Sequence, residues 1–83
     1  MVRGRMEVIL EIHLISDKYE KNLKGSKNLV MVEEGTRVGD LLKHLDIPIE
    51  EVGFVVINGF VVKLDKPIDQ GDKIQLFPPI QGG

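Results

Sequence analysis

The sequence predicts a small α+β domain in which one main helix packs on one face of a mixed or antiparallel sheet. Five short segments have the apolar pattern of strands, and one segment between the second and third of them has the three- and four-residue spacing of a helix. A single helix can cover only one face of one sheet. Because the chain has 83 residues, of which 42% are hydrophobic, we expect one domain with one core over residues 1–83.

The first two strands are predicted over Met6–Ile15 and Leu29–Val32. In the first of these segments every second residue is apolar, which is the two-residue period of a strand with one face in a core. The stretch 16–28 is rich in Lys, Asp, Asn, Ser and Gly, so it is interpreted as the loop of a long hairpin.

The helix is predicted to begin after Thr36, whose side chain is a suitable N-cap, and to end before Pro48. Its apolar face is formed by Val38, Leu41, Leu42 and Leu45. Gly39 weakens such a helix by about 1 kcal/mol relative to alanine, so we expect it to form only when it is packed against the sheet.

Three more strands follow the helix. Phe54–Ile57 is wholly apolar, which is consistent with a strand buried on both faces. The dipeptide Asn58-Gly59 predicts a tight hairpin from which Phe60–Leu64 returns. Residues 67–72 form a turn with a glycine at the position for positive φ, and Lys73–Phe77 is the last strand.

Composition excludes several function classes. Eleven basic and thirteen acidic side chains give a formal net charge of −2, which argues against a dedicated nucleic-acid binder. The absence of cysteine excludes a disulfide scaffold and a thiolate metal site. No apolar run approaches the roughly 20 residues of a membrane span, so the expected compartment is the cytoplasm. His13 and His44 lie far apart in the sequence, and a metal site needs more converging ligands than the pattern offers, so no metal site is expected.

The C-terminal end is the most informative segment. Pro78 and Pro79 fix φ and keep the preceding residues extended. Gly82 and Gly83 have no side chain, so the end of the chain is narrow enough to enter a slot that any Cβ would obstruct. We therefore expect 78–83 to form an extended, flexible tail with a reach of roughly 20 Å from the end of the last strand.

The only reactive group at such an end is the α-carboxylate of Gly83. A carboxylate is a poor electrophile, so a partner must first activate it, most simply with ATP, before a nucleophile attacks the acyl carbon. An amine then gives an amide, and a sulfide or persulfide gives a thiocarboxylate. All catalytic groups would come from the partner, so the chain is interpreted as a carrier and not as an enzyme. The alternative is an interaction module whose frayed terminus is inert.

Three segments carry a resemblance to a known family: VVINGFVV, LDKPIDQGDKI and FPPIQGG. With the order of strands and helix, they closely resemble the ubiquitin-like sulfur carriers, which include the small subunit of molybdopterin synthase and the sulfur carrier of thiamin biosynthesis. The resemblance implies the β-grasp (ubiquitin-like) fold, in which the first and last strands lie side by side and parallel at the centre of the sheet.

The resemblance also implies roles for the tail and for its partners. Gly83 resembles the glycine that is adenylated and converted to a thiocarboxylate, and Gly82 and Gln81 are its neighbours in the threading segment. The segment that a partner grips matches Phe77, Pro78, Pro79 and Ile80. The implied partners are a ubiquitin-activating-type adenylating enzyme that uses ATP, a sulfur donor and a target synthase. No cofactor is expected on the chain itself.

Partner docking is also considered for two aromatic residues, Phe60 and Phe77, because interfaces are enriched in aromatic side chains. The alternative is that both side chains simply cover the sheet.

The pathway is left open by the sequence. The ending FPPIQGG favours molybdopterin biosynthesis, for a molybdenum or tungsten cofactor, with the large subunit of molybdopterin synthase as target. The short connection over 46–53 is more similar to the thiamin carriers, whose target is a thiazole synthase, and Gln81 stands where the family usually has a small residue. A further alternative is a protein modifier joined to lysines through Gly83.

Overall fold

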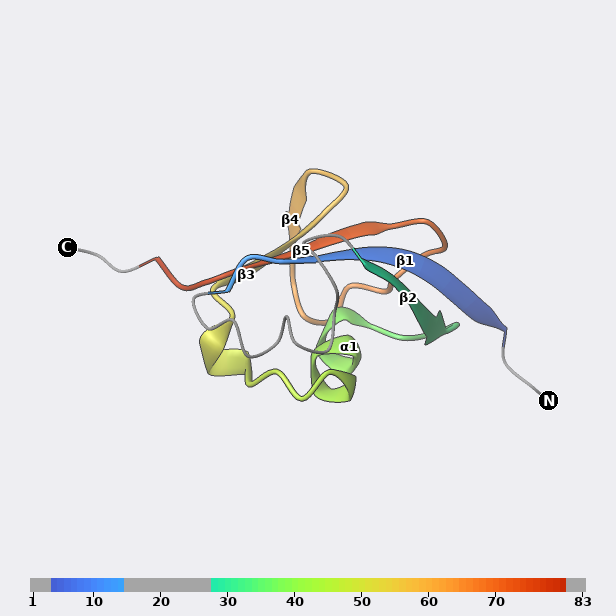
Figure 1. Ribbon diagram of the computed structural model, residues 1–83, viewed down its shortest axis with the longest axis horizontal. Coiled ribbons are helices and arrows are strands. Elements are labelled where there is room, and N and C mark those ends of the chain that lie inside the picture. Colours follow the sequence, from blue (N-terminus) through green and yellow to red (C-terminus); the bar gives the residue numbers. More distant parts are fainter. Residues whose placement is uncertain (1–3, 15–27, 81–83) are drawn as a thin grey trace.

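The computed structural model describes residues 4–14 and 28–80 and confirms the predicted α+β class. Five strands form one sheet, and the helix α1 lies with the short 3-10 helix η2 on one of its faces (Figure 1). In chain order the elements are β1 (Arg5–Ile12), β2 (Asn28–Glu33), α1 (Val38–His44), η2 (Ile49–Glu51), β3 (Phe54–Ile57), β4 (Phe60–Val62) and β5 (Lys73–Phe77).

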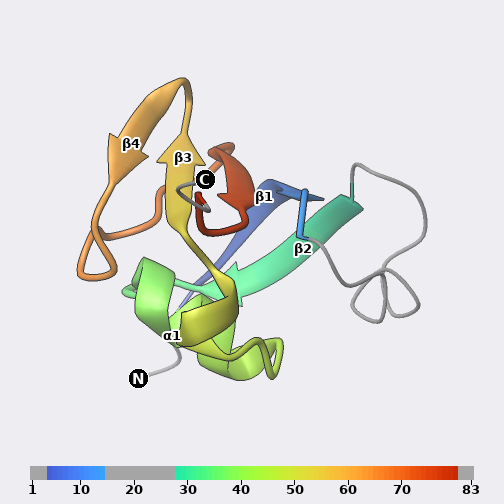
Figure 2. The ribbon, with the colours of Figure 1, turned by 90° about the vertical axis from the view of Figure 1, so that its left-hand side faces the viewer.

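The strands lie in the order β2-β1-β5-β3-β4, as Figure 2 shows from the end of the sheet. β1 and β5 are parallel, with Ile12 beside Leu76, and the other three neighbouring pairs are antiparallel. The last strand of the chain is therefore the middle strand of the sheet and is hydrogen-bonded on both sides. This is the β-grasp arrangement that the sequence resemblance implies.

The core lies between the sheet and α1. Alternate residues of the strands point toward the helix, and the apolar face predicted for the helix meets them. The largest fully buried side chains are Leu10, Leu41, Leu42, Ile74, Leu76, Val8, Val38 and Val55. In β3 the side chains alternate between buried and half-buried, so only one face of this strand belongs to the core.

The first strand is shorter than predicted. β1 ends at Ile12, whereas the alternation of apolar residues predicted a strand to Ile15, which itself lies outside the described residues. The reason is the partner strand: the amide of His13 donates the last bond of the ladder to the carbonyl of Leu76, over 2.8 Å, and β5 ends one residue later. The apolar pattern continues without a strand, because Leu14 still packs half-buried against the core.

The predicted N-cap of the helix is wrong. Arg37, not Thr36, is the N-cap residue, with an extended backbone at φ −104° and ψ 166°. The carboxylate of Asp40 accepts a hydrogen bond from the Arg37 amide over 3.1 Å. The amide of Gly39 donates to the carbonyl of Leu64 over 2.8 Å. Backbone carbonyls of a neighbouring segment thus satisfy amides that a Thr side chain was expected to satisfy.

The hairpin between β3 and β4 has the predicted turn. Asn58 and Gly59 both have positive φ, 52° and 89°, which is the backbone of a two-residue type I′ turn. Gly71 adopts φ 83° in the later turn, also as predicted. The returning strand ends at Val62 and not at Leu64, because the chain at Leu64 has already turned toward α1.

Candidate functional site

The candidate site begins where the chain leaves β5. We define the tail root as the four residues Phe77, Pro78, Pro79 and Ile80. Exposure rises along the tail root, from the half-buried Phe77 and Pro78 to Ile80, which is 86% exposed. Gln81, Gly82 and Gly83, the predicted threading residues and acyl group, lie outside the described residues.

The backbone of β5 is held on both sides up to its last residue. On one side the amide of His13 donates to the carbonyl of Leu76, and on the other the amide of Gly53 donates to the carbonyl of Phe77 over 2.7 Å. The two prolines that follow have no amide hydrogen and cannot extend the ladder. The sheet therefore ends abruptly at Phe77, at the end of the molecule opposite the start of β1 (Figure 1).

Gly53 lies directly against the prolines of the tail root. A Cβ atom placed on Gly53 would be 2.6 Å from the carbonyl carbon of Pro78 and would also overlap the Pro78 oxygen and the Cα of Pro79. Gly53 is not among the glycines with positive φ, so its backbone conformation does not require glycine. The close approach of the tail root is what leaves no room for a side chain at this position.

The side chain of Phe77 lies between two other rings. The ring of His13 stacks on it at a centroid distance of 4.8 Å and an interplanar angle of 8°. The ring of Phe54 stacks on it at 4.9 Å and 11°. Phe54 begins β3 and His13 directly follows β1, and these are the two strands beside β5. The last residue of β5 is thus held by its side chain as well as by its backbone.

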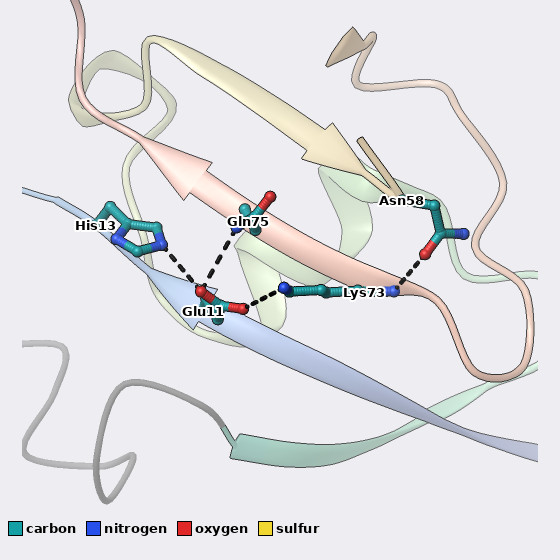
Figure 3. A network of polar contacts seen from close by, with 5 residues as sticks. All are labelled: Glu11, His13, Asn58, Lys73 and Gln75. Carbon is teal, nitrogen blue, oxygen red and sulfur yellow. Dashed lines mark hydrogen bonds and ion pairs between the residues drawn. The ribbon is translucent and has the colours of Figure 1, made fainter. Parts of the chain in front are cut away.

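A buried carboxylate orients the histidine of this stack. Glu11 is only 6% exposed, and its Oε1 lies 3.2 Å from Nε2 of His13 and 3.5 Å from Nε2 of Gln75. Its Oε2 forms an ion pair with Nζ of Lys73 over 3.1 Å (Figure 3). The contact with the Lys73 ammonium favours the ionised form and outweighs burial, so the pKa of Glu11 is lowered below its ordinary value.

A second polar cluster locks the two turns at the other end of β5. The buried carboxylate of Asp72 accepts hydrogen bonds from Nδ2 of Asn58 over 2.9 Å and from the amide of Asp69 over 2.8 Å. The Oδ1 of Asn58 accepts from the amide of Lys73 over 3.0 Å (Figure 3). The Asp72 carboxylate therefore joins the Asn58 side chain to the turn that precedes β5.

Phe60 is not part of the tail root. It pairs with Ile57 at one end of β3, whereas Phe77 pairs with Phe54 at the other end. Phe60 is 75% exposed, so most of its side chain faces solvent. The four residues of the tail root are consecutive in the sequence, and Phe60 lies at the other end of β3 from them.

The described chain also has a pocket away from the tail root. A pocket of about 490 Å³ lies between the end of β2 and α1, lined in part by Arg5, Asp40 and His44, at the opposite end of β1 from the tail root. Within residues 4–14 and 28–80, no three His, Asp or Glu side chains are grouped so as to hold a metal ion. No helix in this part of the chain has the length and apolar character needed to span a membrane.

Sequence reasoning missed Glu11, His13, Gly53 and Phe54 as neighbours of the tail. His13 was considered only as a metal ligand, and Phe54 only as part of a strand. The resemblance implies that the first and last strands are parallel neighbours. This pairing could have predicted which residues lie beside the tail. With Ile12 beside Leu76, His13 necessarily lies beside the root of the tail.

The chain matches the ThiS family model over residues 18–83, which is most of its length. A curated relative, protein RnfH of Methylococcus capsulatus, is 36% identical over 52 residues, which cover 59% of this chain and 52% of the relative. The chain thus spans about half the length of this relative.

Solved structures with a similar fold include small archaeal modifier protein 1 of Haloferax volcanii, with a TM-score of 0.68 at 21% identity over 90% of this chain and 99% of the other. A putative molybdopterin converting factor subunit 1 from Pyrococcus furiosus has a TM-score of 0.67 at 22% identity, over 90% of this chain and 99% of the other. A chain in the complex of subunits 1 and 2 of the molybdopterin-converting factor from Helicobacter pylori has a TM-score of 0.57 at 21% identity, over 94% of this chain and 100% of the other. At this level of identity the likeness establishes the fold.

Proposed function

Because the chain belongs to the ThiS family of ubiquitin-like sulfur carriers, we propose that it carries sulfur as a thiocarboxylate on Gly83. The observation that supports this most directly is the tail root: it leaves the middle strand of the sheet beside Gly53 and reaches Ile80 at 86% exposure. We infer that the residues after Ile80 reach a partner from this exposed start. The chain itself acts as substrate and carrier, not as catalyst.

The proposed chemistry has three steps. In an adenylating enzyme of the ubiquitin-activating type, a carboxylate oxygen of Gly83 attacks the α-phosphate of ATP, and pyrophosphate leaves. A sulfur donor at the oxidation level of hydrosulfide then attacks the acyl carbon, and AMP leaves with the bonding electrons. The resulting thiocarboxylate sulfur displaces an oxygen leaving group from an electrophilic carbon of a cofactor precursor and forms a thioester. Water then cleaves the acyl–sulfur bond, which leaves the sulfur on the precursor as a thiol and returns the Gly83 carboxylate. The chain binds no cofactor of its own in this scheme, and because activation consumes ATP, the cytoplasm is the proposed compartment.

Molybdopterin biosynthesis is the proposed pathway. The pattern Phe-Pro-Pro-aliphatic at 77–80, followed by Gly82 and Gly83, supports this choice. The fold is shared with subunit 1 of molybdopterin converting factors, one of which was solved in complex with its subunit 2. We therefore propose that the target partner is a large subunit of the same kind.

Two alternatives have specific support. The connection over 46–53 is short, with a single 3-10 turn over Ile49–Glu51, and this length favours the thiazole synthase of thiamin biosynthesis as the target. The shared fold with small archaeal modifier protein 1 favours a modifier, in which a lysine amine attacks the activated Gly83 and forms an isopeptide bond. Both alternatives use the same activation step.

The decisive measurement is a mass spectrum of the protein isolated from its own host under sulfur-replete growth. Trypsin cleaves after Lys73 and releases 74–83, which contains neither methionine nor cysteine. A replacement of one oxygen by sulfur in this peptide therefore cannot be confused with methionine oxidation. Because the whole chain has no cysteine, iodoacetamide should alkylate only the terminal thiocarboxylate.

A variant extended by one alanine after Gly83 is the control, since its carboxylate is displaced from the reacting position. We expect sulfur and alkylation in the original chain and neither in the extended one. A terminal peptide that is uniformly carboxylate while the host's activating enzyme is present would refute the sulfur-carrier proposal. Gly-Gly remnants on lysines of other host proteins, in place of the thiocarboxylate, would support the modifier.

A further inference from the structure

We propose that His13, Gly53 and Phe54 are positioning residues that set the direction in which the tail leaves the sheet, and so the orientation in which Gly83 reaches the activating enzyme. This inference rests on the proposed function, and it assigns a role to three residues outside the tail. The rings of His13 and Phe54 stack on Phe77. Gly53 contacts the tail root through a hydrogen bond and a close backbone approach.

Gly53 controls the path of the backbone. Its amide donates to the carbonyl of Phe77 over 2.7 Å, while its missing side chain leaves room for Pro78 and Pro79 to pass directly over it. Any side chain at this position must push the prolines away, because the obstructing atoms are backbone and cannot rotate aside. Since both prolines have restricted φ, a change of direction at this point is carried on to Ile80.

The two rings control the side chain of the last strand residue. Phe77 is held between the rings of His13 and Phe54, both within 5 Å between centroids and nearly parallel to it. Such stacking restricts the rotamer of Phe77, while the hydrogen bond from the Gly53 amide to the Phe77 carbonyl holds the peptide plane that leads into Pro78. The carboxylate of Glu11 acts one step further away, because its contact with Nε2 of His13 limits rotation of the imidazole.

The positioning matters because the reacting atom lies at the far end of the tail. Adenylation requires a carboxylate oxygen to lie in line with the α-phosphate, and a displacement of about 1 Å from such a geometry reduces rates by roughly 100-fold. A root that is already oriented also loses less conformational entropy when the partner grips the tail. We therefore expect loss of the positioning contacts to raise KM and to lower kcat for adenylation.

The test combines a functional and a structural readout on the full chain. ATP–pyrophosphate exchange catalysed by the activating enzyme of the same host measures kcat and KM for the carrier. Amide residual dipolar couplings of Phe77 and Ile80 measure the orientation of the tail root in the free protein, without any partner. The variants are Gly53→Ala and His13→Ala, with His13→Phe as the conservative exchange that keeps a ring.

Two matched controls separate positioning from stability. Gly59→Ala meets no atom within 4 Å but is strained at φ 89°, so it destabilises the domain at the distant hairpin. His44→Ala removes the other histidine, which is exposed on α1. We expect Gly53→Ala and His13→Ala to change the couplings at Ile80 and to lower kcat/KM by about 10- to 100-fold. His13→Phe and both controls should stay within about twofold of the original chain.

The outcomes distinguish the positioning role of His13, Gly53 and Phe54 from the carrier function of the chain. If the original chain supports exchange but Gly53→Ala and His13→Ala support it equally well, the positioning role is refuted while the carrier function stands. Unchanged couplings at Ile80 in both variants refute it as well. If the original chain supports no exchange at all, the carrier function itself is refuted, and the positioning role falls with it.

Discussion

Truncation of Leu42 to alanine tests whether the helix is held by the core that the structure describes. Leu42 is fully buried on the face of α1 that packs against the sheet. Replacement of such a leucine removes its transfer free energy and leaves a cavity, which together cost about 3–5 kcal/mol where the site cannot collapse. A domain of 83 residues has a total unfolding free energy of roughly 4–12 kcal/mol, so Leu42→Ala should remove a large fraction of it.

The assay is urea unfolding followed by far-UV circular dichroism, since the chain has no tryptophan and one tyrosine and gives little intrinsic fluorescence change. The melting temperature should also fall by roughly 12–24 °C for a loss of about 3 kcal/mol. Leu29→Ala is the matched control, because Leu29 on the edge strand β2 is 67% exposed and its loss should change stability by less than about 0.5 kcal/mol. A loss below 1 kcal/mol for Leu42→Ala at an unchanged m-value would refute this account of the core.

Three further predictions concern charge, turns and the tail. The pKa of Glu11 is lowered from its ordinary value of 4.5, so ionised Glu11 stabilises the fold above that pH, and this contribution is lost as the pH falls below it. Glu11→Gln should therefore lower the unfolding free energy at pH 7. The unfolding free energy of this variant should also decline less below about pH 4.5, as measured by urea titrations from pH 3 to 7. Asp72→Ala leaves the Asn58 side chain and a turn amide without their carboxylate acceptor and should cost about 2–4 kcal/mol, whereas Asp65→Ala, at an exposed position, should cost little in the same assay. Extension of the chain beyond Gly83 should abolish alkylation by iodoacetamide while the thermal unfolding curve stays unchanged; a parallel loss of stability would contradict the separation of tail and core.

The fold could be predicted from the sequence where one local signal dominates. The type I′ hairpin follows from Asn58-Gly59, because both residues tolerate positive φ. The apolar face of α1 follows from its three- and four-residue spacing. The end of β1 could not be read in this way, since the strand stops where its partner β5 stops, and that partner lies more than sixty residues later in the chain.

The candidate site shows the same division between local and distant causes. The tail root could be identified from Phe77 and the two prolines, because their effects on the chain are local. Gly53 could not, since a glycine before a strand has many local explanations and its contact with Pro78 exists only in the folded chain. His13 likewise carries no signal until the parallel pairing of β1 with β5 puts its ring on Phe77.

The attachment of the tail to the middle strand has a mechanical consequence. A pulling force on the tail acts along β5, which is paired with β1 on one side and β3 on the other. Both ladders are then loaded in shear, so that many hydrogen bonds must break at once and cannot open one after another as at a sheet edge. A force applied to the tail would therefore act on a strand that is hydrogen-bonded on both sides and not on a sheet edge.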